Sequence, residues 1–372
     1  MLAPQSAYVH LPWCIRKCPY CDFNSHPLKP EHDLDRYIGS LSQDWQGQRE
    51  RLHIEPQFHT IFFGGGTPSL FTPEQLSRVL ELLSVDPDAE VTMEANPGTT
   101  EHADFSDYRA AGINRLSLGA QTFSDAKLKS IGRIHQAEDT IKAFDLARLG
   151  GFDNINLDLM WGLPEQTVAE ALSDLTQAIE LNSEHISWYQ LTLEPKTEFF
   201  RRQPLLPVDQ TLADIERLGL ALLKDCGYER YEVSAYARSG RYSQHNLNYW
   251  SFGDYLGLGA GAHGKWSNSE TSKLSVVRTF KPSQPRLYME SPRQTTHDPV
   301  SLNDLPLEFM MNALRLVDGV SKASFTERTG LAWDVVRQRW ERLHDRGLVQ
   351  LDRCATTPMG LRYLDSVLAE FV

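Results

Sequence analysis

Long apolar stretches and an excess of basic residues are both missing from this sequence. No segment approaches the roughly 20 consecutive apolar residues that a membrane helix needs. The first residues, MLAPQSAYVHLPWC, do not combine a basic start with a long apolar run, so no signal peptide is expected. The formal net charge of −12, from 37 basic and 49 acidic residues, argues against general nucleic-acid binding. We therefore expect a cytoplasmic protein that has no transmembrane segment and binds no nucleic acid.

Cysteine is scarce, and its distribution excludes a disulfide framework. The 372 residues include five cysteines, an odd number. Cys226 and Cys354 stand alone and are expected to be inert, buried or partly buried thiols. The other three, Cys14, Cys18 and Cys21, lie close together near the start of the chain, whereas a disulfide framework spreads its cysteines along the chain. In a reducing cytoplasm, clustered thiols indicate a metal site.

The spacing of the three clustered cysteines favours an iron–sulfur cluster. Thiolates are the usual ligands of such clusters, and three of them leave one iron of a [4Fe-4S] cubane open. An open metal position is where chemistry usually takes place. The two basic residues between the first two cysteines are expected to favour thiolate over thiol. The alternatives are inert thiols and a structural zinc site completed by His26, although zinc ligands usually come in two separated pairs.

Strand and helix patterns alternate over the first half of the chain. The β-rich runs lie at Ser6–Pro12, Thr60–Gly64, Glu90–Ala95, Arg115–Gln121, Asn154–Met160 and His185–Leu193. Helical patterns lie at Pro73–Leu83, Phe105–Ala111, Glu138–Leu149, Thr167–Leu181 and Leu212–Cys226. This alternation predicts an α/β fold with parallel strands, and the six units fit a partial (β/α)6 barrel. Ligands of such folds gather at the carboxyl ends of the strands, where the cysteines and a glycine run lie.

The expected domains are residues 1–240, an intermediate segment 241–300 and a module at 301–372. The intermediate segment is aromatic and glycine-rich at first, and Asn268–Pro299 is expected to be a loop or linker. The last module has helical patterns and two short strands, at Pro306–Leu316, Ser324–Thr329, Trp333–Arg346, Leu348–Asp352 and Ala355–Thr357, with a final helix from Gly360. This order predicts a winged-helix-like α+β module. Such modules often bind DNA, but the interleaved acids and bases favour packing against the barrel.

The cysteine motif and several other stretches resemble the radical S-adenosylmethionine (SAM) superfamily. CxxxCxxC directly after a first strand resembles its cluster motif, and GGGTP after the second strand resembles its glycine motif, although GGGTP alone would indicate only a tight turn. The whole chain resembles the family of oxygen-independent coproporphyrinogen III oxidase and its relatives. The matching stretches are YVHLPWC, FFGGGTPS, MEANPGT, NRLSLGAQTF, NLDLMWGLP and the C-terminal module.

This resemblance implies a fold, two cofactors and a set of binding residues. The fold would be a partial radical SAM barrel with a [4Fe-4S] cluster on Cys14, Cys18 and Cys21. The positions implied to contact SAM are Tyr8, Tyr20, Gly65, Gly66, Thr67, Glu94, Gln121, Arg133 and Asp158.

Two features distinguish the sequence from the oxidase itself. The oxidase pattern continues as CxxxCxxCxC, but Phe23 stands at the position of the fourth cysteine. Residues 245–250, HNLNYW, resemble the HNxxYW motif of the haem-chaperone branch. That resemblance implies a protein that binds haem and passes it to apo-haemoproteins, with haem contacts at His245, Asn246, Tyr249 and Trp250.

Alternatives remain for both the haem ligand and the activity. His245 is the expected axial ligand because it lies in the motif, whereas His263 is a competing ligand. A histidine beside aromatic residues can also be a core residue. The alternative activities are oxidative decarboxylation of coproporphyrinogen III by a 5′-deoxyadenosyl radical, and methyl transfer by a related radical SAM methyltransferase.

Overall fold

The chain forms one large mixed sheet covered by helices. The computed structural model describes residues 4–52, 56–98, 104–268 and 274–372. In these residues, twelve strands form one sheet in the order β14-β13-β12-β11-β1-β4-β5-β6-β7-β8-β10-β9, and β2 and β3 form a separate pair. The strands are β1 Ser6–Leu11, β2 Trp13–Cys14, β3 His26–Pro27, β4 Phe58–Gly65, β5 Val85–Ala95, β6 Arg115–Gln121, β7 Ile155–Trp161, β8 His185–Gln190, β9 Glu229–Glu232, β10 Ala235–Ala237, β11 Tyr255–Leu258, β12 His263–Asn268, β13 Ser275–Phe280 and β14 Thr296–Pro299.

The six predicted strands are adjacent and parallel. They are β1, β4, β5, β6, β7 and β8, each paired in parallel with the next. The sheet continues beyond them, because β11 adds in parallel beside β1 and further antiparallel strands extend both edges. The α/β class is therefore confirmed, whereas the sheet is larger than a six-stranded unit.

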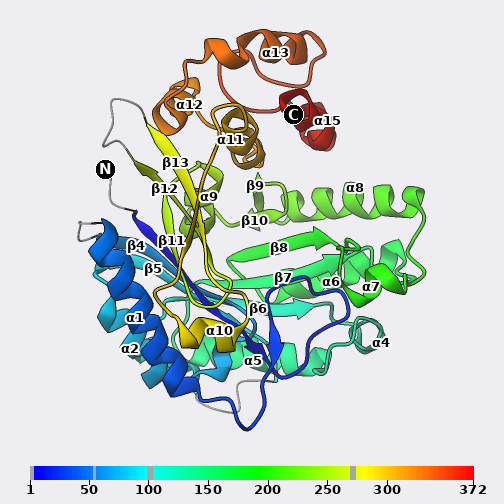
Figure 1. Cartoon of the computed structure of the whole chain (residues 1–372). Helices are drawn as coiled ribbons and strands as arrows, with labels where there is room; N and C mark the ends of the chain where they lie inside the picture. Colours follow the sequence, from blue (N-terminus) through cyan, green and yellow to red (C-terminus); the bar gives the residue numbers. More distant parts are fainter. Residues whose placement is uncertain (1–3, 53–55, 99–103, 269–273) are drawn as a thin grey trace.

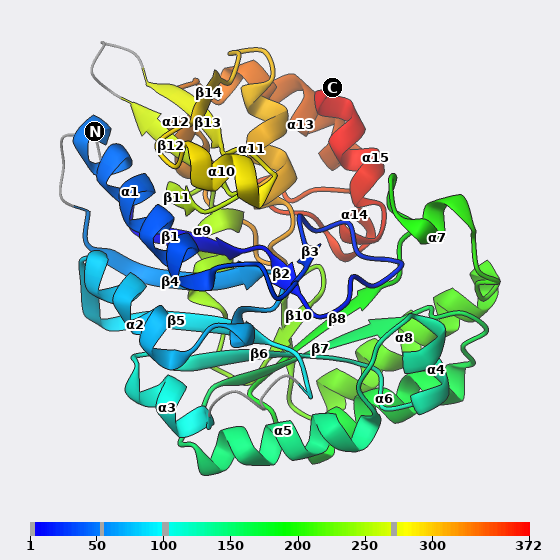
Figure 2. The same ribbon diagram turned by 60° about the horizontal axis from the view of Figure 1, so that its bottom comes forward.

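Helices cover the outside of the parallel strands (Figure 2). The helices are α1 Leu34–Leu52, α2 Pro73–Leu82, α3 Phe105–Ala110, α4 Asp125–Ser130, α5 Ala137–Leu149, α6 Val168–Glu180, α7 Glu198–Arg201, α8 Asp209–Asp225, α9 Gln244–Trp250, α10 Pro285–Glu290, α11 Leu305–Ala313, α12 Lys322–Thr329, α13 Asp334–Asp345, α14 Pro358–Arg362 and α15 Leu364–Leu368. The sequence analysis missed α1. None of the helices in the described part of the chain is both long and apolar enough to cross a bilayer.

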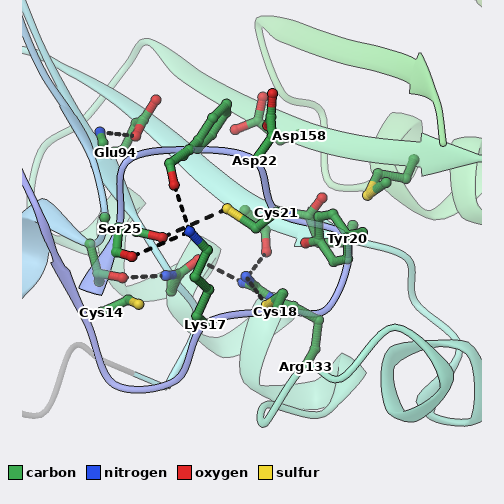
Figure 3. Close-up of a pocket in the computed structure, with 18 of the residues that line it drawn as sticks. Cys14, Lys17, Cys18, Tyr20, Cys21, Asp22, Ser25, Glu94, Arg133 and Asp158 are labelled. Carbon is green, nitrogen blue, oxygen red and sulfur yellow. Dashed lines mark hydrogen bonds between the residues drawn. The ribbon is translucent and has the colours of Figure 1, made fainter. Parts of the chain in front are cut away.

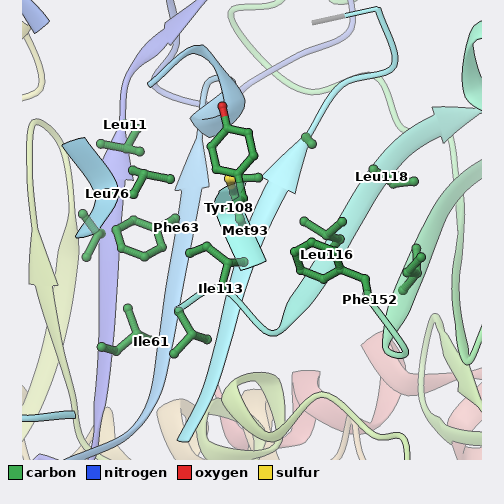
Figure 4. Close-up of a cluster of buried hydrophobic side chains, with 14 of the residues drawn as sticks. Leu11, Ile61, Phe63, Leu76, Met93, Tyr108, Ile113, Leu116, Leu118 and Phe152 are labelled. Atoms are coloured by element: carbon green, nitrogen blue, oxygen red, sulfur yellow. The ribbon is translucent and has the colours of Figure 1, made fainter. Parts of the chain in front are cut away.

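The main hydrophobic core lies between the sheet and these helices. Figure 4 shows side chains from neighbouring strands, among them Ile61, Phe63, Met93 and Leu116, packed in one layer, and all four are buried. Every residue of β6 is buried, as expected for a parallel strand with both faces covered. This rigid layer fixes the carboxyl ends of the strands, where the predicted site residues lie.

The predicted loop at Asn268–Pro299 is wrong in part. Residues 269–273 lie outside the described residues, but the rest contains β13, α10 and β14. β13 pairs antiparallel with β12 and with β14, so this segment extends the sheet. Its short β-branched run, Val276 to Thr279, was obscured by the polar and proline-containing residues around it.

The C-terminal module lies over one end of the sheet (Figure 1). The first three of its four predicted helices are present as α11, α12 and α13, and the fourth, predicted from Gly360, is divided into α14 and α15. The two predicted wing strands are not formed as strands: Val349 and Thr356 make a single antiparallel bridge. The core of the module includes Phe252 and Val276. The module therefore packs onto the segment before residue 301.

Candidate functional site

One pocket collects the three cysteines and nearly all predicted SAM residues. It has a volume of about 480 Å³ and lies where the carboxyl ends of β4 to β8 meet the loop after β1. Its lining includes Cys14, Cys18, Cys21, Tyr20, Gly65, Gly66, Thr67, Glu94, Gln121, Arg133 and Asp158. Figure 3 shows the three cysteines of the loop around the same space, with Glu94 and Asp158 on the far side. The volume is in the range typical of small-molecule sites.

The cysteine loop places its thiols apart, along the pocket wall. Cys14 lies in β2, which pairs with β3, and the Cys21 amide donates to the Cys18 carbonyl at 3.1 Å. Cys21 Sγ lies 3.8 Å from Ser25 Oγ. Among the described residues, no three Cys, His, Asp or Glu side chains are gathered close enough to hold a single metal ion. A cubane is larger than one ion and each of its thiolate ligands binds a different iron, so three thiols along one pocket suit such a cluster.

The zinc alternative also lacks its fourth ligand. His26 Nε2 lies 3.3 Å from Asn24 Oδ1, and the atom that His26 presents to the Cys14 thiol, at 3.7 Å, is its carbonyl oxygen and not a ring nitrogen. The structure therefore gives no support to a Cys3His site.

The basic residues of the loop do not dominate the thiol pKa values. Lys17 Nζ donates to the carbonyls of Phe23 at 2.8 Å and Ser25 at 3.3 Å. Burial raises the pKa of the Cys14 and Cys21 thiols, and the nearby lysine charge only partly opposes this effect. The effect of Lys17 on these two pKa values has the expected direction, but burial has the larger effect.

The glycine turn packs against the strand that leads into the cysteine loop. Gly65 has a φ of +114°, and a Cβ there would lie 2.4 Å from the His10 ring. A Cβ on Gly66 would lie 2.3 Å from the Trp13 carbonyl oxygen, and the next amide, of Thr67, donates to that oxygen at 2.7 Å. These contacts show that the glycines make room for the strand that leads into the cysteine loop, and both glycines also line the pocket. Their contact with SAM remains a prediction.

A hydrogen-bonded chain joins the glycine turn to a cysteine. Asn96 Nδ2 donates to Thr67 Oγ1 at 2.7 Å, and Arg133 donates to Asn96 Oδ1 at 2.6 Å and to the Gly119 carbonyl at 2.9 Å. Arg133 also points at Cys18 Sγ, at 3.8 Å. Its Nε is buried without a hydrogen-bond partner among the described residues. A pocket wall with a cation and an unused donor fits a carboxylate group of a ligand.

Two buried carboxyl groups form the opposite wall. Burial, followed by the nearby Asp158, raises the pKa of Glu94 to about 8, although the Gly65 amide donates to Glu94 Oε2 at 3.1 Å. Burial also raises the pKa of Asp158, against hydrogen bonds from Ser117 at 2.7 Å and Asn156 at 2.9 Å. Acceptors of this kind suit hydroxyl or ammonium groups of a ligand.

The remaining predicted SAM residues differ in position. Gln121 ends β6 with a φ of 66°, and its Oε1 accepts a hydrogen bond from the Tyr189 hydroxyl at 2.9 Å. Tyr20 lines the pocket. Tyr8 does not line it: its hydroxyl donates to His10 Nδ1 at 3.0 Å, and its ring packs on Phe62. The prediction that Tyr8 contacts SAM is therefore not supported by the described geometry.

Sequence analysis missed several polar residues of the pocket, among them Asn96 and Tyr189. Asn96 lies two residues after Glu94, within the MEANPGT stretch, and Tyr189 lies near the end of β8. A systematic inspection of strand ends would have found both, since ligands of parallel sheets bind there.

The HNLNYW segment lies at the other end of the parallel strands. It forms α9, so His245 and Tyr249 lie on one helical face as expected. His245 is 1% exposed and packs against Phe62. Its Nδ1 lies 2.8 Å from Thr60 Oγ1 and its Nε2 lies 2.8 Å from the Tyr249 hydroxyl. Both ring nitrogens are therefore engaged.

The contacts of His245 define its tautomer. Thr60 donates its hydroxyl proton to Ser6 Oγ at 2.7 Å, so Thr60 accepts from His245 Nδ1–H. Nε2 then accepts the proton of Tyr249. Burial lowers the pKa of His245 to about 3, so the ring is neutral. Thr60 and Tyr249, and not the neighbouring Asn246, therefore orient this ring.

Trp250 faces the C-terminal module. The guanidinium of Arg315 lies over its ring at 4.4 Å and also pairs with Glu232 at 3.1 Å. The role of His245, Asn246, Tyr249 and Trp250 in haem binding remains a prediction. What the contacts establish is that α9 joins the sheet to the module.

Comparison with known proteins agrees with this site. A family model described as the radical SAM superfamily matches residues 8–177, and one described as the HemN C-terminal domain matches residues 300–355. The chain is 46% identical to "Heme chaperone HemW" of Escherichia coli over 100% of this chain and 99% of that relative. It is 44% identical to the protein of the same name from Haemophilus influenzae over 100% and 98% of the two chains.

A solved structure shows the same fold. Coproporphyrinogen III oxidase (HemN) from Escherichia coli matches with a TM-score of 0.81 over 99% of this chain and 90% of that chain, at 22% identity. The parallel sheet, the cysteine loop and the family matches together define a radical SAM protein. Within that superfamily, the chain belongs to the HemW family.

Proposed function

We propose that this protein is a haem chaperone, which binds haem and transfers it to apo-haemoproteins. The observation that carries the proposal is the 46% identity with "Heme chaperone HemW" over the full length of both chains. Phe23, at the position of the fourth cysteine of the oxidase pattern, supports the same assignment. Clustered iron-binding thiols need a reducing compartment, so we propose a cytoplasmic location.

We further propose that the pocket holds a [4Fe-4S] cluster and SAM. Cys14, Cys18 and Cys21 would ligate three irons and leave the fourth for SAM. Arg133, positioned by Asn96, would hold the carboxylate of SAM, and the Glu94 and Asp158 wall would accept from its hydroxyl or ammonium groups. When bound, the cluster supplies single electrons. These residues bind and orient the cofactors, and the haem-transfer role needs no further chemistry from them.

A spectroscopic and transfer assay tests the function. Purified protein mixed with haem is expected to show a Soret band that survives gel filtration. Addition of an apo-haemoprotein such as apomyoglobin should then move the haem to that acceptor, which is measured by its own absorption after separation. Absence of a retained Soret band, with the protein folded and its cluster assembled, would contradict the proposal.

Oxidase activity is the second candidate because the fold matches the oxidase structure. An oxidase must direct a radical at the propionate chains of a reduced tetrapyrrole, and the fourth cysteine of its pattern is replaced by Phe23. We expect no conversion of coproporphyrinogen III to protoporphyrinogen IX in an anaerobic assay with reconstituted protein and SAM. Conversion at rates above a Cys18→Ala control would favour the enzyme instead.

A further inference from the structure

His263 presents an imidazole that makes no hydrogen bond with the residues that the structure describes. It is the first residue of β12, and its side chain is exposed. Its strand partner in β13 is Phe280, which is 36% exposed and whose ring lies 5.9 Å from the imidazole. Partial burial, followed by the nearby charge of Arg278, lowers the pKa of His263 from 6.5 and so favours the neutral ring.

The cysteine loop is anchored beside this histidine. Asn24 Nδ2 donates to the carbonyls of Ala260 at 3.0 Å and Ser283 at 2.8 Å, on either side of the β12–β13 hairpin. The Asn24 carbonyl lies 2.9 Å from His10 Nε2, which holds this residue to β1 as well. Phe23, the neighbour of Asn24, is 57% exposed. An exposed imidazole and two exposed phenylalanines thus lie where the cysteine loop meets the hairpin.

We infer that His263, and not His245, is the axial ligand of haem iron in this protein. An iron ligand needs a neutral imidazole with a free lone pair, and His263 offers one. His245 could bind iron only after losing Tyr249 from Nε2 and leaving the core. The Phe280 ring gives a porphyrin an apolar contact beside the iron. The inference rests on the proposed haem-chaperone function and names the site at which haem would bind, on the cysteine-loop side of the sheet.

Haem titration of single variants tests this assignment. His263→Ala is expected to lower haem affinity by about tenfold or more and to shift the Soret band, and added imidazole should restore the band. Phe280→Ala should weaken binding without moving the band, since it removes only packing. His245→Ala should lower the melting temperature but leave the haem spectrum of the folded protein unchanged. His59→Ala is the matched control, because His59 is exposed and pairs with Asp86 at the opposite end of β4.

The outcomes separate the ligand assignment from the function. If wild-type protein retains no haem, the proposed function fails and this inference with it. If wild-type protein binds haem and His263→Ala leaves its spectrum and affinity unchanged, the function stands and the assignment of His263 is overturned. If folded His245→Ala shows a spectral shift and His263→Ala shows none, His245 in α9 is the ligand.

Discussion

Cys18 is the cysteine whose role can be separated most cleanly from folding. Unlike Cys14, which is buried in β2, it lies partly exposed in the loop and faces Arg133. Cys18→Ala is therefore expected to fold but to lose most of its iron, because a cubane with two remaining thiolates has two irons without protein ligands. Iron content and visible absorption after anaerobic reconstitution measure this. Cys226→Ser is the control, and full iron in Cys18→Ala would disprove the ligand assignment.

Glu94 should make the stability of the cluster-free protein depend on pH. Its pKa rises from 4.5 to about 8 on folding, so the folded protein holds the proton more tightly than the unfolded chain. The stabilisation is complete below pH 4.5 and is lost as the pH rises through about 8. Asp158 acts in the same direction.

Glu94→Gln removes the carboxyl group whose ionisation lowers the stability as the pH rises. Between about pH 5 and about pH 8, the melting temperature of the variant is expected to fall by less than that of the wild type. Thermal denaturation at both pH values measures the difference. Glu81→Gln, an exposed change on α2, should behave as wild type. An equal loss in Glu94→Gln and wild type would show that this carboxyl is ionised in the folded protein.

The glycine turn after β4 is in contact with the start of the cysteine loop, so a change in the turn should affect the cluster site. An added Cβ at Gly66 would collide with the backbone of Trp13, next to the first cysteine. Gly66→Ala is therefore expected to destabilise the protein by about 1–3 kcal/mol and to lower cluster content along with SAM affinity. Denaturant unfolding, iron content and calorimetry with SAM measure the three effects.

Gly39→Ala is the matched control for this change. Gly39 lies in α1, and an added Cβ there meets nothing within 4 Å. Normal cluster content in Gly66→Ala with SAM affinity alone reduced would favour the simpler idea that the turn contacts only SAM.

Elements differ in how far the sequence predicts them. The parallel strands were found because continuous apolar runs mark buried strands, and β6 was found to the residue. α1 was missed because its buried face includes Ser40 and Asp44, which interrupt the apolar pattern. β14 was missed because Thr-His-Asp-Pro carries no apolar signal and is mostly exposed at the sheet edge.

The candidate site, like the fold, was only partly predictable from the sequence. Residue types and spacing predicted the thiols, and the resemblance to the radical SAM superfamily supplied the other pocket-lining residues, because both rest on local motifs at strand ends. The surroundings of His245 were not predictable, since Thr60 and Ser6 come from strands 185 residues or more away in the sequence. Hydrogen bonds between distant segments decide whether a histidine is free to bind iron.

At the scale of the whole molecule, a buried ion pair fastens the first helix to the last strands. Asp44 is 0% exposed and pairs with Lys281, and it also accepts hydrogen bonds from Tyr288 at 3.0 Å and the Gly259 amide at 3.1 Å. Asp44→Ala leaves Lys281 buried without its partner, so the free energy of unfolding should fall by about 3–5 kcal/mol. Chemical denaturation measures this loss.

A second ion pair between the same segments provides the control. Glu50 and Arg293 lie 3.0 Å apart but are exposed, so Glu50→Ala should cost about 1 kcal/mol or less. Replacing both buried partners, as Asp44→Leu with Lys281→Met, should recover much of the stability lost in Asp44→Ala. Equal losses in Asp44→Ala and Glu50→Ala would show that burial does not set the strength of the pair.

The anchoring of Asn24 has a consequence for the order of events during synthesis. The carbonyl of Ser283 that holds this loop residue comes 259 positions later in the chain. β11, which pairs with β1 and precedes the other anchoring carbonyl, is also made late. While the ribosome is still making the middle of the protein, the three thiols are already exposed but lack the hairpin that supports their loop. Cluster insertion is therefore expected to follow completion of the chain rather than accompany its synthesis.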